Sequence, residues 1–191
     1  VCQTRSVVNL YTAVLLVVAY LSNDQRLIEN IGNAIRAGED FMGCWEDRLA
    51  EVACEDWSKA IVLAGGETRG IAEEGALALL EIARIPSQFY HSLDVRHGPM
   101  VLVDDDTLVV MCLTENEIEY QKTLINDLLQ RGSTVVTYSE QSPPSLAGVR
   151  LQVSSGRELG PVGRGIHFIL LPQILAYYKA KQKKVNPDQP E

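Results

Sequence analysis

Two glutamates are the residues best placed for acid–base chemistry. Glu74 and Glu81 are seven positions apart, so a helix would place them on nearly the same face, two turns apart, with Ala78 between them. The other side of the same segment is apolar, at Ile71, Leu79, Ile82 and the nearby Leu80. Two carboxylates on one face can exchange protons with a bound molecule. The pattern taken alone, however, favours an amphipathic helix whose acids simply face solvent.

A histidine follows this segment. His97 stands directly before Gly98-Pro99, and histidine is the side chain that exchanges protons most readily near neutral pH. A lone loop histidine is more often structural than catalytic. The same structural interpretation applies to His91 and His167, to which the sequence assigns no role.

A pair of glycines marks the expected binding site. The apolar run 60–64 ends in Gly65 and Gly66, and a helical pattern follows over 71–83. This is the strand, turn and helix order of an α/β unit. Ligands of open parallel sheets bind outside the carboxyl ends of the strands. We therefore expect Gly65 and Gly66 to contact the substrate.

The remaining pattern extends the α/β order. Further strands are expected at 107–113, 134–138 and 149–153, and helices at 115–130 and 161–181. Three helices are expected ahead of the first strand, at 4–20, 24–36 and 42–56. The first is so densely apolar that we expect burial on most of its faces. The sequence therefore predicts an α/β, three-layer αβα fold with a parallel, flavodoxin-like sheet, preceded by helices.

Composition excludes several classes of function. The net charge of -8 argues against nucleic-acid binding, and the lysines of residues 179–184 are typical of a solvated helix end. The apolar stretch 13–21 is shorter than the ~20 residues that span a bilayer. The four widely spaced cysteines indicate reduced thiols in a cytoplasmic protein. Ligand-type residues do not cluster, so we expect no metal, and nothing in the sequence implies a cofactor.

Two motifs carry a family resemblance. Residues 63–82, LAGGETRGIAEEGALALLEI, followed by VRHGP at 95–99, resemble the second domain of tandem proteins of the sugar isomerase (SIS) family, to which glucosamine-6-phosphate synthase belongs. Residues 1–5 resemble the segment that closes the first SIS domain, and residues 171–177 and 188–190 resemble the family's last helix and tail. The resemblance implies a fragment in which residues 1–40 close a preceding SIS domain and residues 41–191 form the second.

The resemblance also implies roles for the candidate residues. The first domain holds the substrate phosphate, while Glu81 moves a proton between C1 and C2 of an open-chain sugar. His97 helps to open the ring and reaches into the site of a partner subunit, and Glu74 is a further active-site carboxylate. Val1 is expected to contact the substrate together with the two glycines. The chain departs from the family pattern at Ala78, where a lysine is usual, and at Gln3, where a serine is usual.

Several functions remain open at this stage. We prefer an isomerase, deaminase or deglycase acting on a phosphorylated ketose or amino sugar, such as tagatose-6-phosphate, galactosamine-6-phosphate or fructoselysine-6-phosphate. Glucosamine-6-phosphate synthase activity would need a glutaminase domain as well, and it is less compatible with Ala78. One alternative is a regulatory SIS module that binds a sugar phosphate without turning it over. Another is a purely structural domain whose partner domain carries out the chemistry. In that case Glu81 would point to solvent.

A homodimer is expected on two grounds. The family pairs its subunits, and the helix at 4–20 has more apolar surface than one small domain easily covers.

Overall fold

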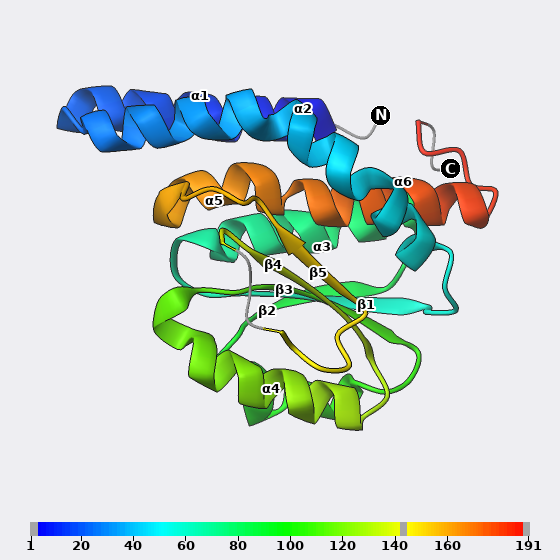
Figure 1. The fold of residues 1–191 in the computed structure, drawn as a ribbon. Coiled ribbons are helices and arrows are strands. Elements are labelled where there is room, and N and C mark those ends of the chain that lie inside the picture. Colours follow the sequence, from blue (N-terminus) through cyan, green and yellow to red (C-terminus); the bar gives the residue numbers. More distant parts are fainter. Residues whose placement is uncertain (1–3, 142–144, 189–191) are drawn as a thin grey trace.

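A parallel sheet organises the chain. The computed structural model describes residues 4–141 and 145–188, and Figure 1 shows a twisted sheet at its centre. The strands are β1 (Lys59–Ala64), β2 (Ser87–His91), β3 (Thr107–Cys112), β4 (Thr134–Ser139) and β5 (Leu151–Ser154). All neighbours pair in parallel, in the order β2-β1-β3-β4-β5. The predicted flavodoxin-like fold is confirmed, and the strand order reverses between β1 and β3.

Helices cover both faces of the sheet (Figure 1). On one face lie α3 (Arg69–Ala83), α5 (Gly160–Phe168) and α6 (Leu170–Gln182), and on the other lies α4 (Ile118–Gln130). The helices α1 (Thr4–Ser22) and α2 (Gln25–Ala53) form a further layer over α5 and α6. Four short 3-10 turns complete the described elements: η1 (Gly66–Thr68), η2 (Val95–His97), η3 (Pro99–Leu102) and η4 (Glu115–Glu117).

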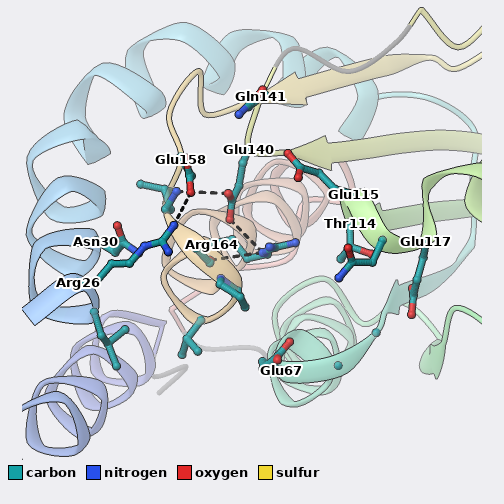
Figure 2. A pocket seen from close by; sticks show the side chains of 18 of the residues that line it. Arg26, Asn30, Glu67, Thr114, Glu115, Glu117, Glu140, Gln141, Glu158 and Arg164 are labelled. Carbon is teal, nitrogen blue, oxygen red and sulfur yellow. Dashed lines mark hydrogen bonds and ion pairs between the residues drawn. The ribbon is translucent and has the colours of Figure 1, made fainter. Parts of the chain in front are cut away.

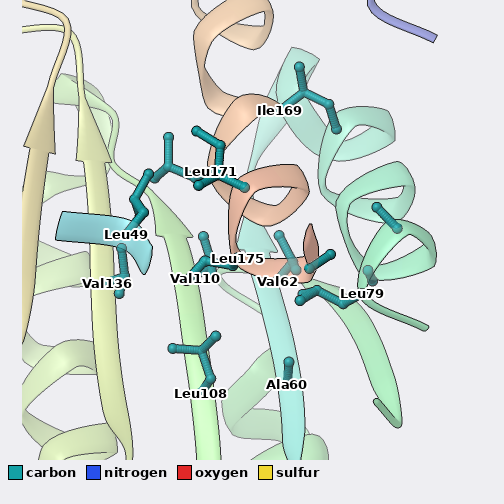
Figure 3. Close-up of a cluster of buried hydrophobic side chains, with 14 of the residues drawn as sticks. Leu49, Ala60, Val62, Leu79, Leu108, Val110, Val136, Ile169, Leu171 and Leu175 are labelled. Carbon is teal, nitrogen blue, oxygen red and sulfur yellow. The ribbon is translucent and has the colours of Figure 1, made fainter. Parts of the chain in front are cut away.

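Alternation along the strands divides the core in two. Figure 3 shows Val62, Val110 and Val136 pointing toward α6, where they join Leu79 and Leu175. The next residue of each strand points the other way and packs under α4, as Ile61, Val109 and Val135 do with Leu124 and Leu128. Because both faces are buried, the central strands are apolar throughout, which made them recognisable in the sequence.

Two predictions of where helices begin and end were wrong. The helices expected at 24–36 and 42–56 form the single helix α2, because Gly38 keeps a negative φ and does not end it. Two α-helices, not three, therefore precede the first strand, and the domain boundary predicted at 40/41 falls inside α2. The single helix expected at 161–181 is split at Ile169, because Pro172 has no N–H to donate back along the chain.

Two further expectations need correction. The edge strand β2 was not predicted, because its five residues include Ser87 and Gln88 and show no apolar run. The expectation that the first helix is buried on most faces was also wrong. In α1 only Leu15 and Ala19 are buried among the side chains that the structure describes, and the rest of the helix is partly or fully exposed.

A glycine fixes the approach of α3 to α6. A Cβ atom added at Gly75 would lie 2.6 Å from Cγ of Pro172, so only glycine allows the two helices to come this close. Elsewhere on the same helix, a Cβ at Gly70 would meet nothing within 4 Å. The contact at Gly75 therefore determines which side of α3 is buried against α6 and the sheet.

We predict that Gly75→Ala lowers the free energy of unfolding by about 1–3 kcal/mol, because the new methyl group overlaps Pro172. Gly70→Ala is the matched control and should raise stability by up to ~1 kcal/mol through its better helix propensity. Urea denaturation measures both variants. Equal effects of the two substitutions would show that the α3–α6 approach is not close-packed.

Candidate functional site

A pocket lies at the carboxyl edge of the sheet, where the strand order reverses. Its volume is about 710 Å³, and its walls come from the start of α2, the turn after β1, the turn after β3, the end of β4 and the start of α5. Gly65 and Gly66 line it, as the sequence predicted from their place after the first strand. Their assignment as substrate-binding residues stays a prediction.

Acidic side chains dominate this pocket. The carboxylates are Asp24, Glu67, Glu115, Glu117, Glu140 and Glu158, whereas the basic side chains are Arg26 and Arg164. Arg26 pairs with Glu158 across 2.8 Å near the surface, where such a pair contributes little stability. Phosphate sites usually offer a surplus of donors and positive charge. The pocket as it stands is therefore poorly matched to a phosphate group.

The second arginine of the pocket is tied down. Nε of Arg164 lies 3.0 Å from Oε1 of Glu140, and only 14% and 12% of these two side chains are exposed. Figure 2 shows Arg164 reaching toward Glu140, with Glu67 and Thr114 elsewhere along the wall. This pair was not predicted from the sequence. The position of Glu140 just after a strand was the one available signal, because side chains at the carboxyl ends of strands surround the site.

The turn that carries His97 is anchored to α4. Arg96 donates from Nε to Asp127 across 2.8 Å, donates to Thr123 across 3.1 Å, and lies over the ring of Tyr120. The hydroxyl of Tyr120 in turn donates to the carbonyl of Leu93. These contacts fix η2, and the side chain of His97 projects from it into solvent. Arg96, the neighbour of His97, therefore holds this turn in place, and the backbone N–H of His97 adds a hydrogen bond to the carbonyl oxygen of Asp94 across 2.9 Å.

Glu74 and Glu81 share the outer face of α3. Glu81 is exposed and Glu74 is half-buried, which agrees with their heptad spacing. Burial raises the pKa of the Glu74 carboxyl above its usual range, and the negative charge of Glu81 raises it further. Glu81 is thus close enough to influence the protonation of Glu74.

The composition of that face differs from the expectation. Ala78, expected between the two carboxylates, is 5% exposed and faces the buried side. Leu80 was assigned to the buried stripe but is 47% exposed, and Leu77 is 41% exposed. Burial on α3 is centred on Gly75 and Leu79, so Leu77 rather than Ala78 occupies the space between Glu74 and Glu81. The outer face of α3 is therefore both acidic and apolar.

The structure places the predicted residues in two areas. Gly65 and Gly66 line the pocket, whereas Glu74, Glu81 and His97 do not appear among its described lining residues. Val1, which was also predicted to contact the substrate, lies outside the described residues. Glu81 is exposed to solvent, which is the outcome expected of a purely structural domain. Within this chain alone, the Glu81 carboxylate is therefore not shielded from water.

A buried histidine joins the helices that wall the pocket. His167 on α5 is fully buried, stacks on Phe41 of α2 with ring centroids 4.6 Å apart, and its Nε2 lies 2.8 Å from the carbonyl oxygen of Ala34. Its Nδ1 has no hydrogen-bond partner in the part of the chain that the structure describes. His167 is structural, as its sequence context suggested.

The described residues contain no group of three or more His, Cys, Asp or Glu side chains that could hold a metal ion. Within the same residues, no helix is both long and apolar enough to cross a membrane. Cys44, Cys54 and Cys112 are free thiols.

Comparison with known proteins gives the family. The model of the SIS domain matches residues 54–158, which is more than half of the chain and includes the glycine turn, α3 and the His97 turn. The chain belongs to the SIS family. The match covers the sheet from β1 to β5, so the fold and the family agree.

Curated relatives are enzymes of sugar phosphates. The chain is 37% identical over 199 residues to the D-galactosamine-6-phosphate deaminase AgaS of Shewanella sp. (strain ANA-3), covering 98% of this chain and 46% of that protein. It is 29% identical over 202 residues to the isomerizing glutamine–fructose-6-phosphate aminotransferase of Escherichia coli (strain K12), covering 100% of this chain and 33% of that protein. The chain thus spans less than half the length of these relatives.

Solved structures show the same SIS fold. Glucosamine-6-phosphate deaminase from Thermotoga maritima superposes with a TM-score of 0.61 at 26% identity, over 76% of this chain and 43% of that one. Tagatose-6-phosphate ketose/aldose isomerase from Escherichia coli gives 0.68 at 23% identity, over 85% and 45%. The second similarity shows the fold alone.

We predict a pH dependence that originates at His167. Burial lowers the pKa of His167, the hydrogen bond to Ala34 opposes this, and the charge of Arg157 lowers it further, so the folded state prefers the neutral ring. Histidine in an unfolded chain titrates near ~6.5. The unfolded state therefore binds more protons below that pH, and stability should fall as the pH drops from about 7 to 5.

Chemical denaturation at several pH values measures the effect. His167→Gln should lose less stability than the wild type over this range, whereas His97→Gln, the same change at an exposed histidine, should follow the wild type. Parallel profiles for the wild type and His167→Gln would contradict the assignment.

Proposed function

We propose that this SIS domain is the acid–base half of a sugar-phosphate isomerase or deaminase-type enzyme, with Glu81 as the group that moves the proton between C1 and C2. The observation that carries the proposal is the outer face of α3, where Glu74 and Glu81 stand together in a chain of the SIS family. The names of its relatives favour an amino-sugar phosphate or a ketose phosphate as substrate.

The proposed reaction gives each of the three side chains its own proton-transfer role. The carboxylate of Glu81 takes the proton from one of the two adjacent carbons of the open-chain sugar, an enediol or enolamine forms, and the same carboxyl returns the proton to the other carbon. Glu74, whose pKa is raised by burial and by the charge of Glu81, is placed to exchange a proton with the sugar oxygens. His97, accessible on its turn, is suited to ring opening.

The proposal requires a cover over α3. A carboxylate removes a proton from carbon efficiently only where water is excluded and its pKa is raised. Leu77 and Leu80, each a little less than half exposed, flank the carboxylates and support a covering surface here. We assign that cover to another SIS domain, which would also hold the phosphate. The acidic excess of the pocket supports placing the phosphate-binding group outside this chain.

The second candidate is a regulatory SIS module that binds sugar phosphate without turnover. The observation in its favour is Ala78, which stands where the family usually has a lysine and is buried rather than facing the carboxylates. Such a module would bind the same ligands. Proton exchange therefore separates the two candidates.

Pairing of subunits is part of the proposal. The resemblance implies that His97 reaches a partner's site, and Val101 and Leu102, which follow it closely on η3, are 77% and 47% exposed. A second copy would cover such residues. The free thiols of Cys44, Cys54 and Cys112 support a reducing, cytoplasmic location.

The test measures proton exchange with solvent, in a polypeptide that contains both SIS domains that the proposal requires. In deuterated water, we predict that galactosamine-6-phosphate, tagatose-6-phosphate or fructose-6-phosphate gains deuterium at C1 or C2, as followed by NMR. Glu81→Gln should lower the exchange rate by roughly 10²–10⁴-fold, which is the usual contribution of a positioned general base.

Glu73→Gln is the matched control, because Glu73 is an exposed carboxylate on the same helix and has no assigned role. It should exchange at the wild-type rate. Binding of these sugars without exchange would favour the regulatory module. Wild-type exchange in Glu81→Gln would remove Glu81 from the mechanism.

A further inference from the structure

One carboxylate of the pocket lies where an anionic ligand would bind. Glu140 directly follows β4, and only 12% of its side chain is exposed. Its Oε1 lies 3.0 Å from Nε of Arg164, and its Oε2 accepts a hydrogen bond from the backbone N–H of Leu159 across 3.3 Å. A cation and a backbone donor thus meet on one negative group, which is the arrangement that proteins offer to bound oxyanions.

The start of α5 supplies this arrangement. Leu159 stands just before the first turn of the helix, where the N–H groups have no partner within the helix and the positive end of the helix dipole lies. The side chain of Leu159 does not cap them. Arg164 belongs to the same helix, slightly more than one turn further on. Glu140, from another part of the chain, therefore takes the place of the anion that a helix N-terminus favours.

Neighbouring contacts hold Glu140 in this position. Its backbone carbonyl accepts hydrogen bonds from the hydroxyl of Ser155 across 2.8 Å and from the N–H of Arg157 across 3.1 Å. A further donor lies at the same end of α5, because a Cβ atom added at Gly160 would lie 2.6 Å from Nδ2 of Asn30 on α2. The carboxylate and the donors near it are thus fixed before any ligand arrives.

Stability alone does not account for the pair. Glu140 and Arg164 are both largely removed from water, so the loss of hydration offsets much of the attraction between the two charges. Within the described part of the chain, Oε1 of Glu140 also receives no hydrogen bond of good geometry. Apolar side chains of similar size would join β4 to α5 about as well. The charges therefore indicate a role in selecting ligands.

We propose that Glu140 is an internal ligand, which fills the anion site formed by Arg164 and the start of α5 and so keeps phosphate and other oxyanions out of the pocket. Figure 2 shows the side chains of Glu140 and Arg164 directed toward each other. An incoming phosphate group must displace this carboxylate in a pocket that holds five more.

Glu140 is thus a specificity-determining residue of this pocket, since it leaves the phosphate of a sugar phosphate to a site outside the chain. The inference goes beyond the proposed proton transfer. Binding measurements test it without any turnover, so its outcome is independent of the role of Glu81.

The experiment removes the internal ligand from the 191-residue chain and offers inorganic phosphate in its place. Glu140→Ala leaves Arg164 without its partner. Its dissociation constant for phosphate, measured by isothermal titration calorimetry, should be at least roughly 10-fold below that of the wild type, because a charge-assisted hydrogen bond becomes available. Phosphate should also raise the thermal unfolding midpoint of this variant, followed by circular dichroism, whereas chloride at equal ionic strength should not.

Two further variants separate this site from a general loss of acidic charge. Glu158→Ala removes a carboxylate from the same pocket and frees Arg26, but the side chains of that pair are 61% and 78% exposed, so phosphate should bind no better than to the wild type. Glu140→Ala combined with Arg164→Ala removes the buried cation as well, and the gain in phosphate affinity should disappear.

Phosphate binding to the wild type as tightly as to Glu140→Ala would overturn the proposal, because the site would then be open already. Equal affinities of Glu140→Ala and Glu158→Ala would overturn it too, and the buried pair would be a structural contact only. Should Glu140→Ala not fold, Glu140→Gln gives the same test, because the amide keeps the size of the side chain and no longer competes for Arg164 as an anion. An affinity equal to that of the wild type would then contradict the proposal.

Discussion

The close contact between Gly75 on α3 and Pro172 on α6 determines which side of α3 is available for chemistry. Two helices that both lie on one face of the sheet must share limited space, and the absence of a Cβ at Gly75 lets them approach. The buried side of α3 is thereby fixed on Gly75 and Leu79. The opposite side, with Glu74 and Glu81, necessarily faces outward. The same helix contact thus determines both the packing of the core and the direction in which the two carboxylates point.

Charge divides the domain into two areas with different capabilities. The pocket at the strand ends holds six carboxylates against two arginines, and both arginines are already paired with carboxylates. The face of α3 combines two carboxylates with Leu77 and Leu80. The pocket is poorly matched to a phosphate group, and the outer face of α3 is accessible but exposed to water. Neither completes a sugar-phosphate site by itself, which is consistent with a domain that works against another surface.

The sequence predicted the central sheet well, because strands buried on both faces are apolar throughout and end in turn residues such as Gly65. It failed where a single residue has two possible effects. Gly38 is compatible with a helix end or a helix interior, and only packing along α2 decides between them. The short, polar edge strand β2 has no apolar pattern to recognise. The pair of Arg164 and Glu140 joins residues far apart in the sequence, so spacing could not reveal it.

Residues of the candidate site were predictable to different degrees. Heptad spacing correctly placed Glu74 and Glu81 on one side of a helix, since that follows from helix geometry alone. The same reasoning misplaced Ala78 and Leu80, because the direction of the buried side is set by the tertiary contact at Gly75 rather than by α3 itself. Exposure of Glu81 likewise depends on what covers α3, which a pattern within this chain does not specify.

The central claim is that Glu74 and Glu81 stand together as an acid–base site on the outer face of α3, and the most direct measurement of that arrangement is a carbon-13 NMR titration of the Glu74 side-chain carboxyl group with and without Glu81→Gln. The account predicts that the pKa of Glu74 lies above the ordinary glutamic acid range and falls when Glu81 is replaced by Gln, while remaining raised by burial. An ordinary pKa for Glu74 that Glu81→Gln leaves unchanged would show that the two carboxylates titrate independently, and would contradict the claim.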